Sequence, residues 1–419
     1  MKHSALKGME DILPPEVAVW QHVESAAREI FGRYGYQEMK LPVLESTDLF
    51  IRSIGETTDI VEKEMYTFTD KGGRSVTLRP EGTASAVRCY IENNLYTLPA
   101  PQKYYYSGPM FRYERPQKGR FRQFYQTGVE ALGNPGPMID AEIIAMLANV
   151  LRAIGLQDVS VELNSIGCEE CRPAYRQALL EFFSGSLTDF CPDCQRRYGT
   201  NPLRILDCKV ERCIDLRQGA PLVVDSLCAH CRQHFDEVRD YLELLQVSYV
   251  LNPNLVRGLD YYTRTTFEVT SLHLGAQKAV AAGGRYDRLV EEFGGPPTPA
   301  IGFAMGMERI VTLLRDLAPA EPLRPKVFIA TLGSAAEKAA CRLAETLRAG
   351  GFWVEPNYGG ASLKSQLRKA DRLGAEYAII IGEDELSAGK IKWKNLSKGT
   401  QGEAPAGEAL SVIEAAIIP

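Results

Sequence analysis

The sequence predicts an α+β protein: a large antiparallel sheet interrupted by a helical insertion, followed by a smaller C-terminal α/β domain. Three observations lead to this prediction. Short strand-like runs separated by turn residues occupy residues 36 to about 130, and similar runs resume after residue 250. A cysteine-rich, charged and mostly helical segment separates these two blocks. Beyond a proline-rich stretch, strand-like and helix-like runs alternate along the chain.

The first part of the predicted sheet domain comprises residues 1–164. Apolar periodicity predicts a helix over residues 15–35, in which Val19, Val23, Ala27 and Ile30 share one face. The runs that follow predict an antiparallel sheet with few helices inside it. They cover residues 40–44, 65–69, 75–78, 103–108 and 124–132. A helix over 140–154 and a strand over 160–164 complete this part.

The predicted insertion, residues 165–250, divides one sheet in two. Strand signals return at residues 255–270 and 278–282, and a helix is expected over 300–317, so that residues 251–317 form the second part of the domain. Residues 318–325, APAEPLRP, contain three prolines and predict a linker.

Alternation of strands and helices predicts a small α/β domain with a largely parallel sheet over residues 326–419. The expected elements, in chain order, are strand 327–331, helix 335–349, strand 353–356, helix 363–373, strand 377–381 and strand 390–396.

Length, apolar runs and net charge limit the classes to which the protein can belong. A length of 419 residues favours two or three domains. No apolar run approaches the roughly 18 residues of a membrane span, and the opening residues hold no secretory signal, so we expect a cytoplasmic protein. The net charge of −5 excludes a uniformly basic surface, yet residues 112–122 form a local basic window with five cationic side chains and one acid, Glu114.

The most informative stretch joins TLRPEGT, residues 77–83, to GPMFRYERPQKGRFRQFYQ, residues 108–126. Two strands would flank a loop rich in arginine, whose planar fork grips two phosphate oxygens and stays charged. The aromatic residues of this stretch offer flat faces for a base or for packing. The alternative is a solvated basic hairpin with aromatic residues in the core.

Two further blocks carry chemistry. LVRGLDYYTRTT, residues 255–266, places Arg257 and Asp260 in what reads as a buried strand, where charge is costly unless it is paired or functional. A structural pair between these two residues is the alternative. In residues 281–287 and 300–309, glycines would let the backbone pass close to a ligand. No glycine-rich phosphate loop is present, so any ATP would bind on a sheet through arginines.

These three blocks resemble, in the same order, motif 2, a histidine-specific block and motif 3 of class II aminoacyl-tRNA synthetases. The opening KGMEDILPPE resembles the start of histidyl-tRNA synthetases, and residues 36–48 resemble motif 1, which builds a dimer interface. RGLDYYTRT is the most specific match, because the related threonyl and prolyl enzymes lack it. The resemblance covers essentially the whole chain. It implies a class II catalytic domain, an anticodon-binding domain at 326–419, and a homodimer.

The resemblance also implies a reaction. L-histidine would attack the α-phosphate of ATP, bound with Mg²⁺, and would then pass to the 3′ end of tRNA(His). Preorganised cations would stabilise the negative charge that grows at the phosphate. Arg112 would hold the α-phosphate, Arg309 the γ-phosphate, and Arg120 would assist. Arg257 would contact both the histidine carboxylate and the α-phosphate, in the place of a catalytic metal.

Substrate contacts follow from the same resemblance. Glu81, Thr83 and Gln126 would bind the α-ammonium group of histidine. Glu130 and Tyr262 would hydrogen-bond its imidazole, and Tyr261 and Tyr286 would complete the pocket. A pocket that pairs with both ring nitrogens rejects isosteres, so no editing domain is needed.

For tRNA, Gln117 and Arg122 would meet the acceptor end. Four basic residues near one face of the helix predicted over 363–373 could contact phosphates: Lys364, Arg368, Lys369 and Arg372. An ordinary solvated helix face is the alternative for these four.

Eight of the ten cysteines fall into four pairs: Cys168 and Cys171, Cys191 and Cys194, Cys208 and Cys213, Cys228 and Cys231. Pairs with two intervening residues are typical of structural zinc sites, and eight ligands would suit two sites or one site with spare thiols. Against zinc, the family as a whole needs none in this insertion, and helices can bury cysteine as a small hydrophobe. The sequence leaves zinc open.

Two other functions remain as alternatives. One is the synthetase-like regulatory subunit of ATP phosphoribosyltransferase, which lacks the C-terminal domain and departs from the ATP and histidine motifs. The other is a class II synthetase for threonine or proline, against which RGLDYY and the missing editing module argue.

Overall fold

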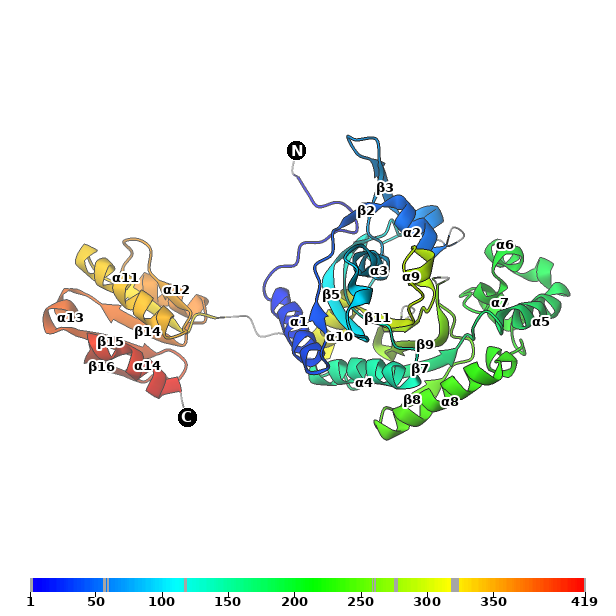
Figure 1. Ribbon diagram of the computed structural model, residues 1–419. Coiled ribbons are helices and arrows are strands. Elements are labelled where there is room, and N and C mark those ends of the chain that lie inside the picture. The colour runs from blue at the N-terminus through cyan, green and yellow to red at the C-terminus, as the bar shows by residue number, and fades with distance from the viewer. Residues whose placement is uncertain are drawn as a thin grey trace. The chain divides into compact units, whose positions relative to one another are not determined.

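The computed structural model describes residues 3–55, 58, 60–116, 119–257, 259, 261–274, 278–317 and 324–417. The chain divides into two compact units, Met1–Ala320 and Glu321–Pro419 (Figure 1). Six residues of the predicted linker, 318–323, lie outside the described part. Among the described helices, none is long and apolar enough to cross a membrane.

An eight-stranded sheet forms the centre of the first unit, in the order β1-β5-β6-β11-β10-β9-β7-β8. The five inner pairings are antiparallel and the two outermost pairings are parallel. The strands, in this spatial order, are Gln37–Glu38, Gln102–Phe111, Gln123–Leu132, Ala300–Gly306, Ala279–Arg285, Thr263–Thr270, Ser160–Ser165 and Tyr249–Leu251. The predicted antiparallel sheet is therefore confirmed.

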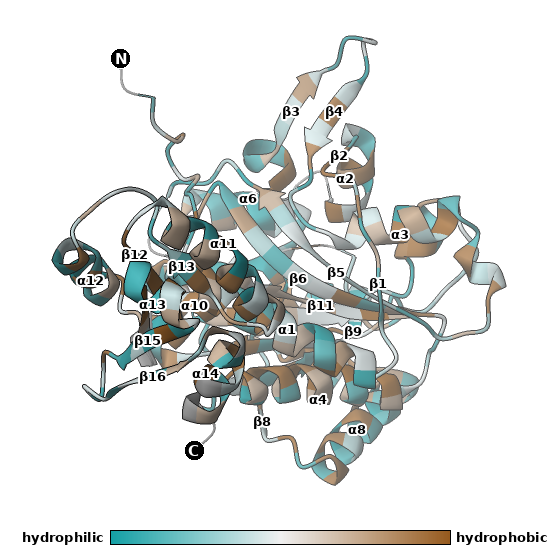
Figure 2. Ribbon diagram, turned by 90° about the vertical axis from the view of Figure 1, so that its left-hand side faces the viewer, coloured by the Kyte–Doolittle hydropathy of each residue, from teal (hydrophilic) through white to brown (hydrophobic). Residues whose placement is uncertain are grey.

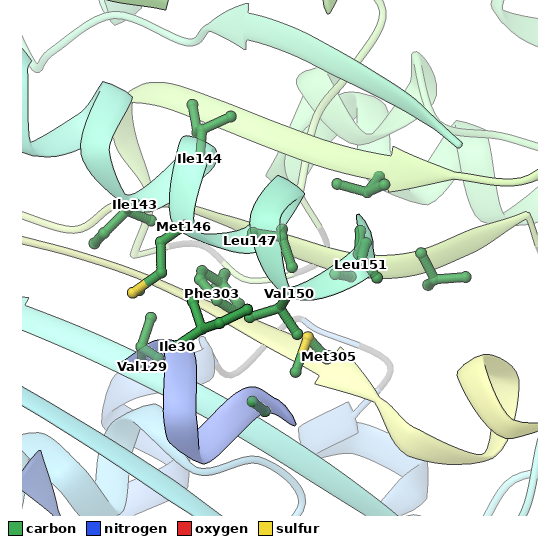
Figure 3. Packing of buried hydrophobic residues seen from close by; sticks show 14 of the residues in the cluster. Ile30, Val129, Ile143, Ile144, Met146, Leu147, Val150, Leu151, Phe303 and Met305 are labelled. Atoms are coloured by element: carbon green, nitrogen blue, oxygen red, sulfur yellow. The ribbon is translucent and has the colours of Figure 1, made fainter. Parts of the chain in front are cut away.

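Helices cover one face of this sheet. The helices α1 (Glu16–Arg33), α4 (Pro137–Ala153) and α10 (Met307–Leu317) contribute to its main apolar core together with α8 (Ala229–Leu244). Apolar residues of α4 recur at helical spacing and meet Val129 of β6 and Phe303 of β11 (Figure 3). Each such fully buried side chain contributes roughly 1.5–3 kcal/mol. Hydropathy alternates along α8 in the same way (Figure 2).

The opposite face of the sheet is partly polar. Side chains alternate between the two faces of a strand, so Val129 and Ala131 enter the apolar core whereas Glu130 faces the other side. On that side lie α2 (Thr47–Ile54), α3 (Thr83–Glu92) and the short helix α9 (Leu289–Glu292). A separate three-stranded antiparallel sheet comprises β2 (Leu44–Ser46), β3 (Tyr66–Thr69) and β4 (Ser75–Leu78).

The insertion leaves the sheet at the end of β7 and returns at β8, which pairs with β7. It is mostly helical (Figure 1). Its helices are α5 (Arg172–Ser184), α6 (Pro192–Thr200), α7 (Glu211–Leu216) and α8.

Three sequence predictions about this unit are wrong. Residues 40–43 are not a strand; the strand found there, β2, begins at Leu44. Residues 300–306 form β11 rather than a helix, because a central strand buried on both faces shows no alternation and reads like a buried helix. Residues 255–257 and 259 are irregular, and β9 begins only at Thr263, so Arg257 does not lie in a buried strand.

The second unit is an α/β domain with a five-stranded sheet in the order β13-β12-β14-β15-β16. The first three strands in this order are parallel and the last two are antiparallel to their neighbours. The six predicted elements occur as β12 (Val327–Thr331), α11 (Ser334–Ala349), β13 (Val354–Pro356), α12 (Leu363–Arg372), β14 (Tyr377–Ile381) and β15 (Lys390–Asn395). The sequence did not predict α13 (Glu383–Ala388), β16 (Gln401–Pro405) or α14 (Ala409–Ile417).

A buried ion pair joins the sheet, its covering helix and the insertion. Arg285 of β10 donates from Nε to both carboxylate oxygens of Asp140 in α4, at 2.9 and 3.0 Å. His234 of α8 contacts Asp140 Oδ2 through Nε2 at 2.9 Å. The side chains of Arg285 and Asp140 are both 0% exposed, so neither charge has water as an alternative partner.

We expect Arg285→Ala to lower the free energy of unfolding by about 3–5 kcal/mol, because it leaves the Asp140 carboxylate buried without its cation. Urea unfolding followed by circular dichroism measures the change. The matched control is Arg288→Ala, whose side chain is 44% exposed and pairs with the exposed Glu169; because water screens this pair, the substitution should cost far less. Equal losses in both variants would contradict a special role for the buried pair.

Candidate functional site

A cavity of about 340 Å³ opens on the polar face of the large sheet. Ten of the residues predicted from the sequence line it: Glu81, Thr83, Arg112, Arg120, Gln126, Arg257, Tyr261, Tyr262, Tyr286 and Arg309. They come from segments more than 200 residues apart in the chain, and the sheet brings them together.

The remaining predicted residues lie elsewhere. Glu130 is 1% exposed and is not a lining residue, but its carboxyl bonds Thr83 and Tyr286, which line the cavity. Arg122 does not line the cavity; its guanidinium lies 3.9 Å from the centre of the Tyr113 ring, and its Nε donates to the carbonyl of Glu114. Gln117 lies outside the described residues.

The Glu130 carboxyl is the most deeply buried acid at this site. Thr83 donates a hydrogen bond to its Oε1 at 2.8 Å, Tyr106 donates to the same oxygen at 3.1 Å, and Tyr286 donates to Oε2. Burial nevertheless raises the pKa of Glu130 to about 8, against an ordinary value of 4.5, because desolvation outweighs these hydrogen bonds. The nearby Glu81 raises this pKa further.

Glycine makes room for this carboxyl. Gly302 of β11 lies opposite Glu130 of β6, and a Cβ at Gly302 would lie 1.9 Å from Glu130 Oε2. Gly128 serves Tyr106 in the same way, since a Cβ there would lie 2.5 Å from the Tyr106 hydroxyl. The glycine pattern predicted that Gly302 would let the backbone pass close to a ligand; Gly302 does line the cavity, and it also leaves room for a side chain of the protein itself. A Cβ at Gly306 would meet only ordinary contacts, the nearest at 3.8 Å.

Glu81 holds the start of α3. Its carboxylate accepts hydrogen bonds from the backbone N–H groups of Thr83 at 2.7 Å and Ala84 at 2.8 Å, which are free donors at a helix N-terminus. Burial raises its pKa, while these hydrogen bonds and the charge of Arg112 oppose the shift. Thr83 thus bonds both carboxyl groups, that of Glu81 through its backbone N–H and that of Glu130 through its hydroxyl, and Glu81 and Thr83 line the cavity.

The cavity wall also holds four arginines, one of which, Arg120, pairs with Glu114. Arg309 donates to the carbonyls of Gly119 at 3.1 Å and Ala279 at 2.7 Å, and Arg112 donates to that of Pro80 at 2.9 Å. Burial lowers the pKa of Arg309, and the like charge of Arg120 lowers it further. Arginines that crowd together against this repulsion are typical of a site for a polyanion.

Arg257 contacts an acid and an aromatic ring of the cavity wall. Its Nη1 donates to Glu268 Oε2 at 3.1 Å, and its guanidinium lies 5.6 Å from the centre of the Tyr262 ring. Asp260, the alternative partner predicted for it, lies outside the described residues. Arg257 Nε and Gln126 Oε1 are buried without a hydrogen-bond partner among the described residues. Buried polar atoms of this kind, on the wall of a cavity, point to a ligand that pairs with them.

Sequence reasoning missed four residues of the site. Tyr106 bonds Glu130, and Glu268 bonds Arg257. Asp207 and Lys209 of the insertion also line the cavity. A signal existed for Glu268, which is a carboxylate within an otherwise uncharged run, TTFEVT. No local pattern marks Asp207 or Lys209, because only the folded insertion brings them to the cavity.

The eight paired cysteines gather into two sets of four. The first cysteine set is Cys168, Cys171, Cys228 and Cys231, and the second cysteine set is Cys191, Cys194, Cys208 and Cys213. Within each set the four sulfur atoms lie within 4.8 Å of one another. Each set could therefore hold a metal ion.

Comparisons with known proteins agree with this geometry. The family described as "Histidyl-tRNA synthetase" matches residues 8–170 and 210–310, and the "Anticodon binding domain" matches residues 326–416. A histidine–tRNA ligase of Thermodesulfovibrio yellowstonii is 53% identical over 99% of this chain and 98% of its own. One of Trichlorobacter lovleyi is 54% identical over 96% of this chain and 95% of its own.

Solved structures give the same result. The crystal structure of apo S. aureus histidyl-tRNA synthetase matches with a TM-score of 0.83 at 37% identity, over 99% of this chain and 100% of that one. The histidyl-tRNA synthetase of Nostoc sp. PCC 7120 shares the fold, with a TM-score of 0.70 at 20% identity, over 99% of this chain and 100% of that one.

A synthetase match over most of the first unit and an anticodon-binding match over the second define the class, an aminoacyl-tRNA synthetase. The resemblance drawn from the sequence motifs is confirmed. The chain belongs to the histidyl-tRNA synthetase family.

The raised pKa of Glu130 predicts a pH-dependent stability. The unfolded carboxyl loses its proton near pH 4.5 and the folded one near pH 8, so the stability contributed by the neutral form is complete below about pH 4.5 and is lost as the pH rises through about 8. Relative to Glu130→Gln, the wild-type chain should lose up to about 1.4 kcal/mol of unfolding free energy per pH unit in this window.

Urea unfolding at pH 5.5 and pH 7.5 measures this difference. The control is Glu29→Gln, at a side chain that is 65% exposed. A constant difference between wild type and Glu130→Gln at the two pH values would show that Glu130 is ionised throughout.

Proposed function

We propose that this protein is a histidine–tRNA ligase that works in the cytoplasm as a homodimer. It activates L-histidine with ATP and Mg²⁺, and it transfers the histidyl group to tRNA(His). The observation that carries the proposal is the mixed polarity of the cavity wall, in which Arg112, Arg257 and Arg309 lie together with the acceptors Glu81 and Gln126. This polarity suits an amino acid, whose ammonium group needs anions and whose carboxylate must meet a phosphate.

In the first step, a carboxylate oxygen of histidine forms a bond to the α-phosphorus of ATP. The bond from that phosphorus to the bridging oxygen breaks, and pyrophosphate leaves. Arg112 and Arg257 stabilise the charge on the α-phosphate, and Arg309 holds the γ-phosphate with help from Arg120. The unpaired Nε of Arg257 supports its role, because it leaves a donor ready for an anion.

The histidine pocket lies around Glu130. Glu81, Thr83 and Gln126 bind the α-ammonium group, and the unpaired oxygen of Gln126 supports its assignment as an acceptor. Glu130 and Tyr262 bind the two imidazole nitrogens, and Tyr261 and Tyr286 close the pocket. The bonds that Glu130 accepts from Thr83, Tyr106 and Tyr286 fix its orientation, which a selective hydrogen-bonding site requires.

In the second step, a terminal ribose hydroxyl of tRNA attacks the histidyl carbonyl carbon, and AMP leaves. Arg122 and Gln117 contact the acceptor end, and residues 326–419 bind the anticodon. Residues 1–164 and 251–317 form the catalytic domain, residues 165–250 form the insertion, and residues 318–325 form the linker. The dimer rests on the motif 1 resemblance, and a single-chain mass in light scattering would exclude it.

Pyrophosphate exchange into ATP with each of the twenty amino acids tests the activity. We expect exchange with histidine alone, and a loss of about 10²–10³-fold in Arg257→Ala, because a preorganised charge at the reacting phosphate is removed. The control is Arg33→Ala, at a side chain that is 68% exposed. A folded chain without histidine-dependent exchange would favour the regulatory-subunit alternative, and exchange with threonine or proline would favour the other synthetases.

The anticodon role predicts a separation of the two steps. Lys364, Arg368 and Arg372 are exposed along one face of α12, whereas Lys369 is half-buried beside Phe328 and Tyr358. Lys364→Ala combined with Arg368→Ala should lower kcat/KM for tRNA about tenfold and weaken its salt dependence, while leaving histidine-dependent exchange unchanged. Lys338→Ala, an exposed lysine of α11, is the control. An unchanged kcat/KM would make this an ordinary solvated face.

A further inference from the structure

The two cysteine sets of the insertion have the geometry of metal sites. In the first set, Cys168 Sγ lies 3.7 Å from Cys171 Sγ and 4.0 Å from Cys228 Sγ. In the second set, Cys191 Sγ lies 3.9 Å from Cys208 Sγ. A tetrahedral zinc ion with Zn–S bonds of about 2.3 Å requires sulfur–sulfur separations of about 3.8 Å. The observed separations match that value.

Disulfides, iron–sulfur clusters and simple core packing fit these distances less well. A disulfide has an S–S bond of about 2.05 Å, and all ten cysteines are free thiols. In a four-iron cluster each cysteine binds a different iron, so its sulfurs lie farther apart than ligands of one ion do. Cysteine that fills a core as a small hydrophobe has no reason to converge in fours. The local geometry therefore favours one ion in each set.

The two sets are built in the same way. A cysteine caps the N-terminus of a helix in each: Cys228 precedes α8 and Cys191 precedes α6. The backbone N–H of Cys228 donates to Cys171 Sγ at 3.2 Å, and that of Cys191 donates to Cys213 Sγ at 3.3 Å. Such N–H···S contacts and the helix dipole stabilise thiolates rather than thiols.

We propose that the insertion binds two structural Zn²⁺ ions, one in each cysteine set, each held by four thiolates. The insertion needs such support because its own core is small: apart from five cysteines, eight buried residues form it. The family match omits residues 171–209, which contain Cys171, Cys191, Cys194 and Cys208. The other four proposed ligands, Cys168, Cys213, Cys228 and Cys231, lie within the matched segments.

Both sites adjoin the proposed histidine and ATP cavity, although none of the eight cysteines is a lining residue of it. Arg172, next to Cys171, donates to the carbonyl of Tyr262, and His230, between Cys228 and Cys231, contacts Arg264 at 3.1 Å. Asp207 and Lys209, on either side of Cys208, line the cavity. The first site thus fixes the insertion against the Tyr262 segment, and the second fixes a stretch of the cavity wall.

Metal analysis of the full chain, purified without chelator from zinc-supplied cells, tests the proposal. We expect two zinc ions per chain, with neither iron nor acid-labile sulfide. Cys231→Ser and Cys194→Ser should each retain one. The matched controls Cys89→Ser and Cys341→Ser, outside both sets, should retain two.

A second measurement does not depend on the stability of the variants. Wild-type chain produced in cobalt-supplied medium should show the visible absorption and sulfur-to-cobalt charge transfer of a tetrahedral thiolate site, at two cobalt ions per chain. A folded wild-type chain with no metal or only one ion, or one with iron and sulfide, would overturn the proposal. So would two zinc ions retained in both ligand variants. These readouts are independent of whether the chain activates histidine.

Discussion

The pairing of Arg285 with Asp140 is the interaction on which the rest of the first unit depends. All three guanidinium nitrogens of Arg285 donate: Nε to Asp140, Nη1 to Asp287 at 2.8 Å, and Nη2 to the carbonyls of Asn134 and Gly136. Burying two charges is costly, and only this full set of partners offsets the loss of water. The pair therefore forms only when β10, α4 and the turn before α4 are all in place.

The same arginine links the core to the site. Tyr286, the next residue, lies on the cavity wall and donates to Glu130. His234 brings the insertion to the Asp140 carboxylate, so α8, which follows Cys228 and carries Cys231, is positioned against the sheet by Asp140. The buried contact between Arg285, Asp140 and His234 therefore connects the cavity wall, the apolar core and the insertion. This connection explains how residues so distant in sequence converge.

Local sequence predicted some parts of this structure well and others poorly, for physical reasons. In the second unit all six predicted elements occur, because α11 and α12 each have one apolar face and glycines lie between the short elements, but α13, which precedes β15, was missed. Strand β11 was missed because burial on both faces removes alternation. The irregular segment around Arg257 was predicted as a strand because apolar and aromatic residues surround that arginine. In the structure these residues line the cavity and do not join the sheet.

For the site, motif residues could be named from sequence, since the chemistry of phosphate and imidazole restricts the residue types. Their partners could not be. Tyr106 became evident only from the pairing of β5 with β6, and Asp207 and Lys209 only from the folded insertion, whereas Glu268 carried the signal of a lone carboxylate in an uncharged run. Cysteine spacing likewise indicated pairs, but it did not reveal that the first pair joins the last across 60 residues.

The glycine opposite Glu130 has a consequence for protein engineering. The Glu130 carboxylate occupies the space where a side chain at position 302 would begin. Side chains at these two positions, on neighbouring strands, would therefore compete for the same space. A designer who wants a pocket for a different amino acid cannot add bulk at 302 alone. Shortening the acid at 130 first releases that volume, and only then can the facing strand carry a new side chain into the binding site. The order of the substitutions, and not only their identity, decides which redesigned pockets can be reached.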